Sequence, residues 1–169
     1  LEVIIANGFD KNALKILKLK KNLRLIDASN FSTNEFLRFN SINNCFLTQS
    51  EDKQIFSREN FKIVSKKRPS KSQFDDLIFA FNICRYVKSN SIVLAYNQST
   101  VGIGSGQPSR LDSCKIAINK MNKFAKTKNE IVAASDAFFP FVDGIEKLVK
   151  SGVTAVIQPA GSIRDKEII

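Results

Sequence analysis

The sequence predicts an α/β fold, a layered domain in which helices pack on a β-sheet. Short runs rich in Val and Ile alternate along the chain with longer segments whose apolar residues recur at helical spacing. Gly, Pro, Asn or Ser separates most of these segments, as expected for turns. The length of 169 residues corresponds to about one domain, and 43% hydrophobic with 25% charged residues is typical of a globular chain.

The first two strands are expected at residues 1–6 and 23–27, on either side of a short helix. The β-branched residues of the first run are typical of a buried strand. Asn7 and Gly8 form a turn signal, and Asp10 is placed to cap a helix that continues through Leu17. The lysines that follow suit the negative end of this helix.

Residues 30–70 carry weaker patterns. The Asn-, Ser- and Thr-rich part at 30–50 predicts only a short strand near residues 36–39. A further extended segment is expected within residues 54–64, and Pro69 ends the region.

The strongest helical pattern begins at Ser72. Ser72 and Asp75 resemble a capping box, with Asp in place of the usual Glu. An apolar stripe for the core then follows at helical spacing: Phe74, Leu77, Ile78, Phe81 and Cys84. We expect the helix to end near residues 88–90.

Residues 92–95 and 101–104 are expected to form a β-hairpin, because turn-forming residues separate them. Gln107 and Pro108 then open a helix, with Pro in its first turn, that continues to Phe124.

The end of the chain predicts two more strands, at residues 131–134 and 154–158. A helix from Pro140 lies between them and stops before Gly152. Ser162 is expected to cap a last helix.

Several classes of protein and site are excluded by composition. The chain has no His and no CxxC pair, which excludes a structural zinc site. Its three cysteines are widely spaced, which argues against a disulfide framework and fits a cytoplasmic protein. No apolar run approaches the roughly 18 residues that a membrane span requires.

The net charge of +10 comes mostly from lysine and allows two interpretations. The favoured one is a solvated lysine-rich surface, because the basic clusters lack the interleaved aromatic residues of a nucleic-acid platform. The alternative is a non-enzymatic basic nucleic-acid-binding module, whose binding would weaken steeply with salt.

Three strand-to-helix transitions carry residues suited to binding, namely 102–110, 135–141 and 158–162. If their strands run parallel, the three transitions meet at one edge of the sheet, where α/β proteins bind ligands. The alternating glycines from Gly102 to Gly106 fit close helix packing better than a phosphate cradle. Arg110 is expected to pair with Asp112 or to hold a carboxamide or carboxylate of a ligand.

Four segments together resemble the bifunctional AICAR transformylase / IMP cyclohydrolase family. They are residues 88–93 (KSNSIV), 101–110 (VGIGSGQPSR), 135–143 (SDAFFPFVD) and 152–162 (GVTAVIQPAGS). The resemblance implies that residues 1–169 are the C-terminal portion of the transformylase domain, a layered α/β/α fold similar to cytidine deaminase but without zinc. It also implies that the cyclohydrolase domain is absent from this chain.

The resemblance implies transfer of a formyl group from 10-formyltetrahydrofolate to the 5-amino group of AICAR, in a cytoplasmic homodimer. No nucleic-acid or membrane partner is implied. The Lys-His pair that assists proton movement in this family would lie upstream of Leu1. The chain alone is therefore expected to be inactive, and none of its residues is assigned a catalytic role.

The resemblance also assigns binding residues. Asn90, Arg110 and Phe138 match positions that hold AICAR, with Arg110 on the carboxamide. The folate pocket is assigned five positions: Leu111, Asp143, Gly144, Ser162 and Ile163. A monovalent cation, potassium, is assigned to Ser89, Ser91 and Asp136. The sequence departs from the family pattern at Asn82, Pro108 and Val142, and Val142 removes a charge that is common near the folate region.

Overall fold

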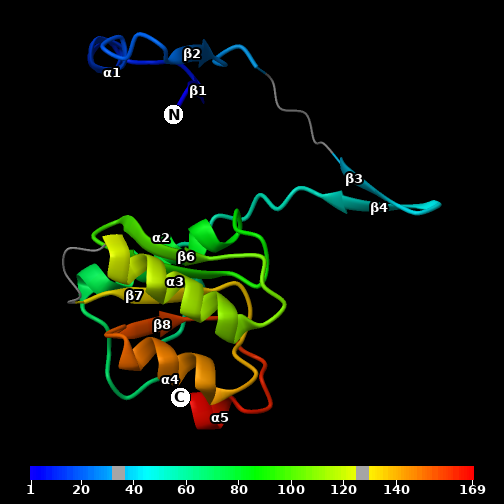
Figure 1. Cartoon of the computed structure of the whole chain (residues 1–169), viewed down its shortest axis with the longest axis vertical. Coiled ribbons are helices and arrows are strands. Elements are labelled where there is room, and N and C mark those ends of the chain that lie inside the picture. Colours follow the sequence, from blue (N-terminus) through cyan, green and yellow to red (C-terminus); the bar gives the residue numbers. More distant parts are fainter. Residues whose placement is uncertain (32–36, 125–129) are drawn as a thin grey trace. The chain divides into compact units, whose positions relative to one another are not determined.

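The computed structural model describes residues 1–31, 37–124 and 130–169 and divides the chain into two compact units. The first unit is Leu1–Lys53 and the second is Gln54–Ile169, each described here by itself (Figure 1). The length alone favours about one domain. The described residues of the first unit include none that is buried, so this unit encloses no core of its own.

The first unit begins with two strands and a helix: β1 (Val3–Ala6), α1 (Lys11–Leu17) and β2 (Arg24–Asp27). The strands pair in parallel, and Asp10 caps α1 by accepting the N–H groups of Asn12 and Ala13 at 2.7 and 2.8 Å. These elements confirm the sequence prediction. The expected burial of β1 is wrong, because a two-stranded sheet with one short helix is too small to enclose it.

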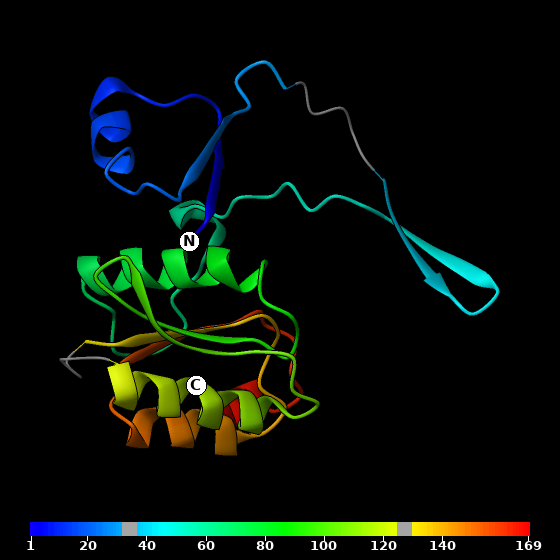
Figure 2. The ribbon, with the colours of Figure 1, turned by 45° about the horizontal axis from the view of Figure 1, so that its top comes forward.

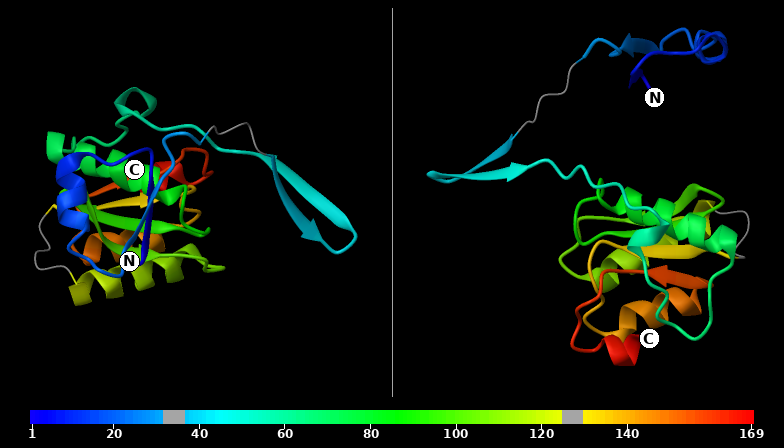
Figure 3. Two further views of the ribbon diagram at one scale, coloured as in Figure 1. Left: turned by 90° about the horizontal axis from the view of Figure 1, so that it is seen from above. Right: turned by 180° about the vertical axis from the view of Figure 1, so that it is seen from behind.

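A β-hairpin completes the first unit. β3 (Leu37–Ile42) pairs antiparallel with β4 (Cys45–Ser50) across Asn43 and Asn44 (Figure 3). Asn43 has a positive φ of 51°, which Asn tolerates in tight hairpin turns. The sequence predicts a strand near residues 36–39, of which Phe36 is outside the described residues, and carries no prediction of β4.

The second unit is built on a four-stranded sheet in the order β6-β5-β7-β8. The strands are β5 (Ile92–Tyr96), β6 (Ser99–Gly104), β7 (Val132–Ser135) and β8 (Ala155–Ile157). β5 is antiparallel to both of its neighbours, and β7 is parallel to β8. As a result β6, β7 and β8 all run in one direction and β5 runs against them.

Helices cover both faces of this sheet, which confirms the predicted α/β/α layering (Figure 2). α2 (Lys71–Cys84) lies on one face, and α3 (Arg110–Phe124) and α4 (Val142–Lys150) lie on the other. The short α5 (Asp165–Ile168) contacts α4. None of the helices within the described ranges is both long enough and apolar enough to cross a bilayer.

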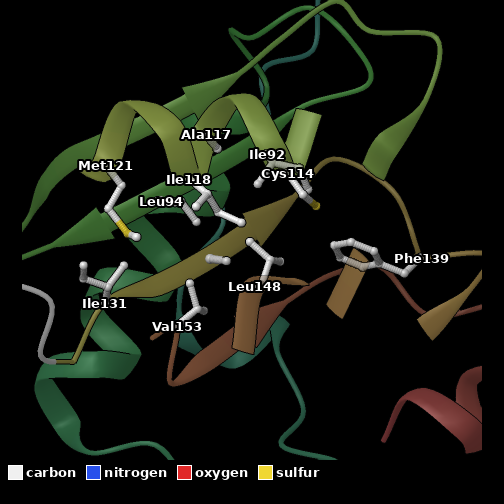
Figure 4. Close-up of a cluster of buried hydrophobic side chains, with 11 residues drawn as sticks. Ile92, Leu94, Cys114, Ala117, Ile118, Met121, Ile131, Phe139, Leu148 and Val153 are labelled. Atoms are coloured by element: carbon white, nitrogen blue, oxygen red, sulfur yellow. The ribbon is translucent and has the colours of Figure 1, made fainter. Parts of the chain in front are cut away.

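Two apolar layers hold the sheet to its helices. Under α3 and α4, the core is formed by residues that include Ile92, Leu94, Met121 and Leu148 (Figure 4). On the α2 side it is formed by Leu77, Ala80, Cys84, Val93, Ala95, Val132 and Ala134. β5 is therefore buried on both faces, and each of its larger side chains contributes about 1.5–3 kcal/mol by leaving water.

The boundaries of α2 differ from the prediction. Its capping box is Ser70 with Gln73, in which Ser70 Oγ accepts the Gln73 N–H at 3.2 Å and Gln73 Oε1 accepts the Ser70 N–H at 2.8 Å. Gln at this position reaches back to the cap, so Ser70 is used and the expected start at Ser72 is wrong. α2 also ends at Cys84, earlier than residues 88–90.

The segment at 54–64 is not a strand. It is irregular, with one 3-10 turn, η1 (Arg58–Asn60). Asn82 of α2 holds it: the Asn82 side chain accepts the Phe56 N–H at 2.9 Å and donates to the Phe56 carbonyl at 2.8 Å. Phe56 and Phe61 pack edge-on against Phe81, with ring centres 5.0 and 5.2 Å away. The segment that the sequence predicts to be extended is thus held by tertiary contacts and pairs with no strand among the described residues.

Three other helix starts fall later than expected. α3 begins at Arg110 and α4 at Val142, so Pro108 and Pro140 precede their helices. Ser162 does not cap α5. Its Oγ accepts the Arg164 N–H at 3.1 Å and closes the turn before that helix.

Candidate functional site

The topology of the second unit brings four loop segments to one end of its sheet. Ile92, at the start of β5, pairs with both Gly104 and Ser135, and Ala134 pairs with Ile157. The segments 88–91, 105–110, 136–141 and 158–162 therefore lie at this end, which we call the site edge. The predicted convergence is confirmed, although only β7 and β8 are parallel neighbours.

Arg110, the first residue of α3, joins three of these segments. Its Nη2 donates to Asn90 Oδ1 at 2.8 Å, and its Nη1 donates to Ser135 Oγ at 2.9 Å and to Asp136 Oδ1 at 2.5 Å. Only 10% of the Arg110 side chain is exposed. The guanidinium is held as a fixed planar donor, which suits recognition of a carboxamide or carboxylate.

Asp112 is not the acidic partner of Arg110, so that sequence expectation is wrong. Asp112 Oδ1 instead accepts from Lys115 Nζ at 2.8 Å on the exposed side of α3. Asp136, the residue directly after β7, is the acidic partner of Arg110, because the end of that strand lies beside the start of α3.

The side chain of Asn90 is oriented by hydrogen bonds at both ends of its amide. Its Nδ2 donates to the carbonyls of Gln107 and Pro108 at 2.9 and 3.0 Å, which leaves Oδ1 facing Arg110. Its backbone carbonyl accepts from Ser113 Oγ at 2.7 Å. Asn90 and Arg110, two residues predicted to bind one ligand, are thus in direct contact.

Asp136 is a charged group whose ionisation is favoured by its surroundings. Burial raises the pKa of the Asp136 carboxyl, but hydrogen bonds from Ser89, Arg110 and the Ser91 N–H outweigh that effect and lower the pKa below its ordinary value. Asp136 is therefore an anion at neutral pH that offsets the charge of Arg110, and it is a weak proton acceptor.

Phe138 lies on the same edge, and the backbone that leads into it is linked to Arg110 through Ser135, whose hydroxyl donates to the Ala137 carbonyl. It belongs to the loop after β7 and is 39% exposed. The next residue, Phe139, is buried, and its N–H donates to Gln158 Oε1 at 2.9 Å. Phe138 thus sits exposed between two anchored neighbours, where a ligand ring can stack on it.

The five positions assigned to folate lie at three places next to the site edge. Leu111, Asp143 and Gly144 lie in the first turns of α3 and α4, and Ser162 and Ile163 lie in the loop after β8. Ile163 is fully exposed. Gly144 is buried, and a Cβ there would lie 2.7 Å from the Phe139 ring, so Gly144 has a packing role.

The glycine run before Arg110 serves packing, as predicted. A Cβ on Gly102 would lie 2.2 Å from the Ala117 carbonyl oxygen, and one on Gly104 would lie 1.9 Å from that of Ser113. β6 and α3 therefore meet backbone to backbone. Gly106, with φ of +68°, instead turns the chain and donates its N–H to the Lys88 carbonyl at 2.8 Å.

The residues assigned to a monovalent cation do lie together. Asp136 accepts hydrogen bonds from the Ser91 N–H and the Ser89 side chain. Ser91 Oγ is fully buried and has no hydrogen-bond partner among the described residues beyond the weakly polar thiol of Cys84. One carboxylate and two hydroxyls suit a monovalent ion, and the described residues contain no cluster of three or more zinc-type ligands.

The three cysteines are free thiols, and the two buried ones are poor nucleophiles. Burial raises the pKa of Cys84 and of Cys114 to about 12. Neither thiol is ionised at neutral pH, so neither carries the chemistry of the site edge.

Two buried serines in this network are absent from the sequence assignments. Ser113 anchors the Asn90 backbone, and Ser135 contacts Arg110. Ser135 is a small polar residue at the end of an otherwise apolar strand, and that signal in the sequence could have identified it. Ser113 lies among other polar residues of α3, so its sequence carries no such signal.

Comparison with known proteins finds sequence similarity between this chain and one protein family. A family model described as "AICARFT/IMPCHase bienzyme" matches residues 1–120. A bifunctional purine biosynthesis protein PurH of Chlorobium phaeobacteroides (strain BS1) is 44% identical over 168 residues, covering 99% of this chain and 32% of the relative. The protein of the same name from Aquifex aeolicus (strain VF5) is 44% identical, covering 100% of this chain and 33% of the relative. The one from Buchnera aphidicola subsp. Baizongia pistaciae is 46% identical, covering 99% of this chain and 32% of the relative. The chain thus spans about a third of the length of these curated relatives.

Proposed function

Because this chain belongs to the AICARFT/IMPCHase bienzyme family, we propose that it forms part of the AICAR-binding wall of a formyltransferase. In the proposed reaction, the formyl group of 10-formyltetrahydrofolate passes to the 5-amino group of AICAR during purine biosynthesis. The relatives, named bifunctional purine biosynthesis proteins, support the pathway, and the family assignment favours an enzyme over a basic nucleic-acid-binding module.

The observation that carries this proposal is the contact between Asn90 and Arg110 at the site edge. A guanidinium has five N–H donors, and hydrogen bonds to described residues use three of those of Arg110. The remaining donors are available to the carboxamide oxygen of AICAR. Phe138, exposed on the neighbouring loop, offers an apolar ring to the same ligand.

The proposed role of these residues is to orient the substrate. An aromatic amine conjugated to a carboxamide is a weak nucleophile, so fixing its position against the formyl donor supplies much of the rate. Proton removal requires a base. Arg110 and Asn90 cannot accept a proton, and Asp136 is a poor acceptor because its pKa is lowered. We therefore propose that the chain alone lacks transformylase activity and that a base from another segment completes the site.

The folate and cation sites remain proposals that the placement of their residues supports. Leu111 and the fully exposed Ile163 offer apolar contacts to a pteridine ring, while Asp143 is exposed for polar contacts. Ser89, Ser91 and Asp136 would hold potassium, which supplies positive charge beside the carboxylate. The buried Ser91 Oγ, which among the described residues contacts no polar group stronger than the Cys84 thiol, fits such an ion.

The first unit supports assembly into a larger body, which we propose is a homodimer of the full-length protein. Its described residues include none that is buried, and it exposes large apolar side chains such as Ile5, Phe39 and Phe46. Apolar surface of this kind marks interaction sites.

Titration of the chain with AICAR, followed by NMR, tests the proposal. Arg110→Ala is expected to weaken binding at least about tenfold, because it removes charged donors to the carboxamide. Lys115→Ala is the matched control: it removes the same charge from the exposed side of α3 and should leave affinity within about twofold. Equal affinity of wild type and Arg110→Ala would refute the assignment of Arg110.

A turnover assay with AICAR and 10-formyltetrahydrofolate tests the inactivity of the isolated chain. No formylated product is expected. Rapid turnover by this chain would contradict our argument that the base lies in another segment.

A further inference from the structure

Ser135 is a buried polar residue at the centre of the site edge to which neither the motifs nor the family resemblance assigns a role. It is the last residue of β7, pairs with Ile92 of β5, and is completely buried. Burying a hydroxyl costs free energy unless hydrogen bonds replace those that it made with water. The hydrogen bonds of the buried Ser135 hydroxyl therefore indicate why a serine occupies this position.

The hydroxyl connects the guanidinium of Arg110 to the loop that follows β7. It accepts a hydrogen bond from Arg110 Nη1 at 2.9 Å and donates one to the carbonyl of Ala137 at 2.7 Å. A hydroxyl has a single proton, and here that proton is directed at Ala137. Only lone pairs then face Arg110, so Ser135 orients the guanidinium as an acceptor beside the charged Asp136.

The bond to Ala137 also fixes the backbone on which Phe138 is mounted. The Ala137 carbonyl, which belongs to the peptide bond leading into Phe138, is tied to the end of β7 through Ser135. On the other side, the N–H of Phe139 is tied to Gln158 Oε1 at 2.9 Å. Phe138 thus stands between two anchored peptide groups while its ring stays exposed.

We propose that Ser135 is a positioning residue of the AICAR site, holding the Arg110 guanidinium and the backbone of Phe138 in one fixed relation. This inference rests on the proposed function. Ser135 acts through Arg110 and Phe138 and does not itself contact the nucleotide. A serine with only a structural role would stabilise the end of β7 without affecting guanidinium motion or nucleotide affinity.

The test compares Ser135→Ala with the matched control Ser151→Ala in the full 169-residue chain. Ser151 Oγ also donates to a backbone carbonyl, that of Leu148, at 2.7 Å, but it lies at the far end of α4. Three quantities are measured: the melting temperature, the AICAR affinity by NMR titration, and, without ligand, the proton–nitrogen signals of the Arg110 guanidinium.

Ser135→Ala is expected to weaken AICAR binding about tenfold, the typical effect of losing one hydrogen bond to a charged group. In the same variant without ligand, the guanidinium signals of Arg110 should broaden as its rotation becomes easier. Ser151→Ala should lower the melting temperature but leave AICAR affinity and the Arg110 signals unchanged. If Ser135→Ala does not fold, Ser135→Cys replaces it, because a thiol of similar size is a weak acceptor and should shift both readouts in the same direction.

Two results would separate the inference from the proposed function. If Ser135→Ala binds AICAR like wild type and keeps sharp Arg110 signals, Ser135 is only structural, while the proposed function stands. If the wild-type chain does not bind AICAR, the proposed function fails, and the Arg110 signals of the unliganded variants alone decide whether Ser135 positions the guanidinium.

Discussion

At Arg110, one side chain gathers contacts from segments that lie 20 to 26 residues away along the chain. A cation that is 90% buried by its surroundings is stable only if nearby acceptors replace water. Asp136 supplies the charge, while Asn90 and Ser135 supply neutral acceptors. Arg110 and its three partners thus stabilise the fold and also form the proposed binding wall. Substitutions of these residues should therefore affect both the free energy of unfolding and ligand binding.

Asp136→Asn should lower the free energy of unfolding by about 2–4 kcal/mol near pH 7, because it leaves Arg110 without its counter-charge. The folded-state pKa of Asp136 is below its ordinary value of 3.8. Its stabilisation is therefore fully present above pH ~4 and is lost as the pH falls through the folded-state pKa. Urea unfolding between pH 3 and pH 7 should show the difference between wild type and variant shrinking towards acid. A difference that does not depend on pH would contradict this account.

Thiol reactivity should separate the three cysteines. At pH 8, iodoacetamide should label exposed Cys45 in preference to Cys84 and Cys114, whose pKa values burial raises to about 12. Peptide mass spectrometry of the folded chain measures the ratio, and labelling in denaturant is the control, in which all three should react. Early modification of Cys114 would show that the α3 side of the core opens readily.

At the scale of elements, the close packing of α3 on β6 depends on the glycines of β6. Gly104→Ala would place a Cβ 1.9 Å from the Ser113 carbonyl oxygen, so α3 must shift away from the strand. We expect a loss of about 1–3 kcal/mol from overpacking, measured by thermal unfolding. Ser105→Ala, on the exposed next residue, should stay within about 0.5 kcal/mol. Equal stability of the two variants would mean that α3 is not packed as described.

The elements also show how far local sequence patterns determine structure. β5 was predictable because it carries a strong apolar pattern and ends at clear turn residues. α3 was predictable because its apolar residues recur at helical spacing, although the helix begins at Arg110 and not at Gln107. The start of α2 was misplaced, since Ser70 and Ser72 both offer a cap and only Gln73 reaches back to decide between them. The segment at 54–64, expected to be extended, contains a 3-10 turn and is held by Asn82, a residue far away in sequence that binds the Phe56 backbone.

For the second unit as a whole, the sequence indicated which segments form the site edge but not all of the contacts within it. The meeting of Asn90 and Arg110 followed from the family resemblance. The partner of Arg110 did not: Asp112 is near in sequence, and choosing Asp136 requires knowing that β7 ends beside the start of α3. Strand direction likewise depends on pairings between distant residues that no local pattern records.

Apolar exposure on the first unit predicts self-association of the chain. One face of the β3–β4 hairpin carries Leu37, Phe39 and Phe46, all exposed. Light scattering at rising concentration should show oligomers, and the double variant Phe39→Asp and Phe46→Asp should reduce them. Asn40→Asp, on the opposite face, adds a charge without removing apolar surface and is the control. A wild-type chain that stays monomeric throughout would refute the prediction.

The close packing of α3 on the glycines of β6 affects how precisely Arg110, the first residue of α3, is positioned. Where two main chains touch directly, van der Waals contact between backbone atoms sets their spacing, which does not change when side chains change rotamer. The backbone from which the Arg110 side chain starts is therefore held at a fixed distance from β6, and the side chains of Asn90, Ser135 and Asp136 then only have to set the direction of the guanidinium.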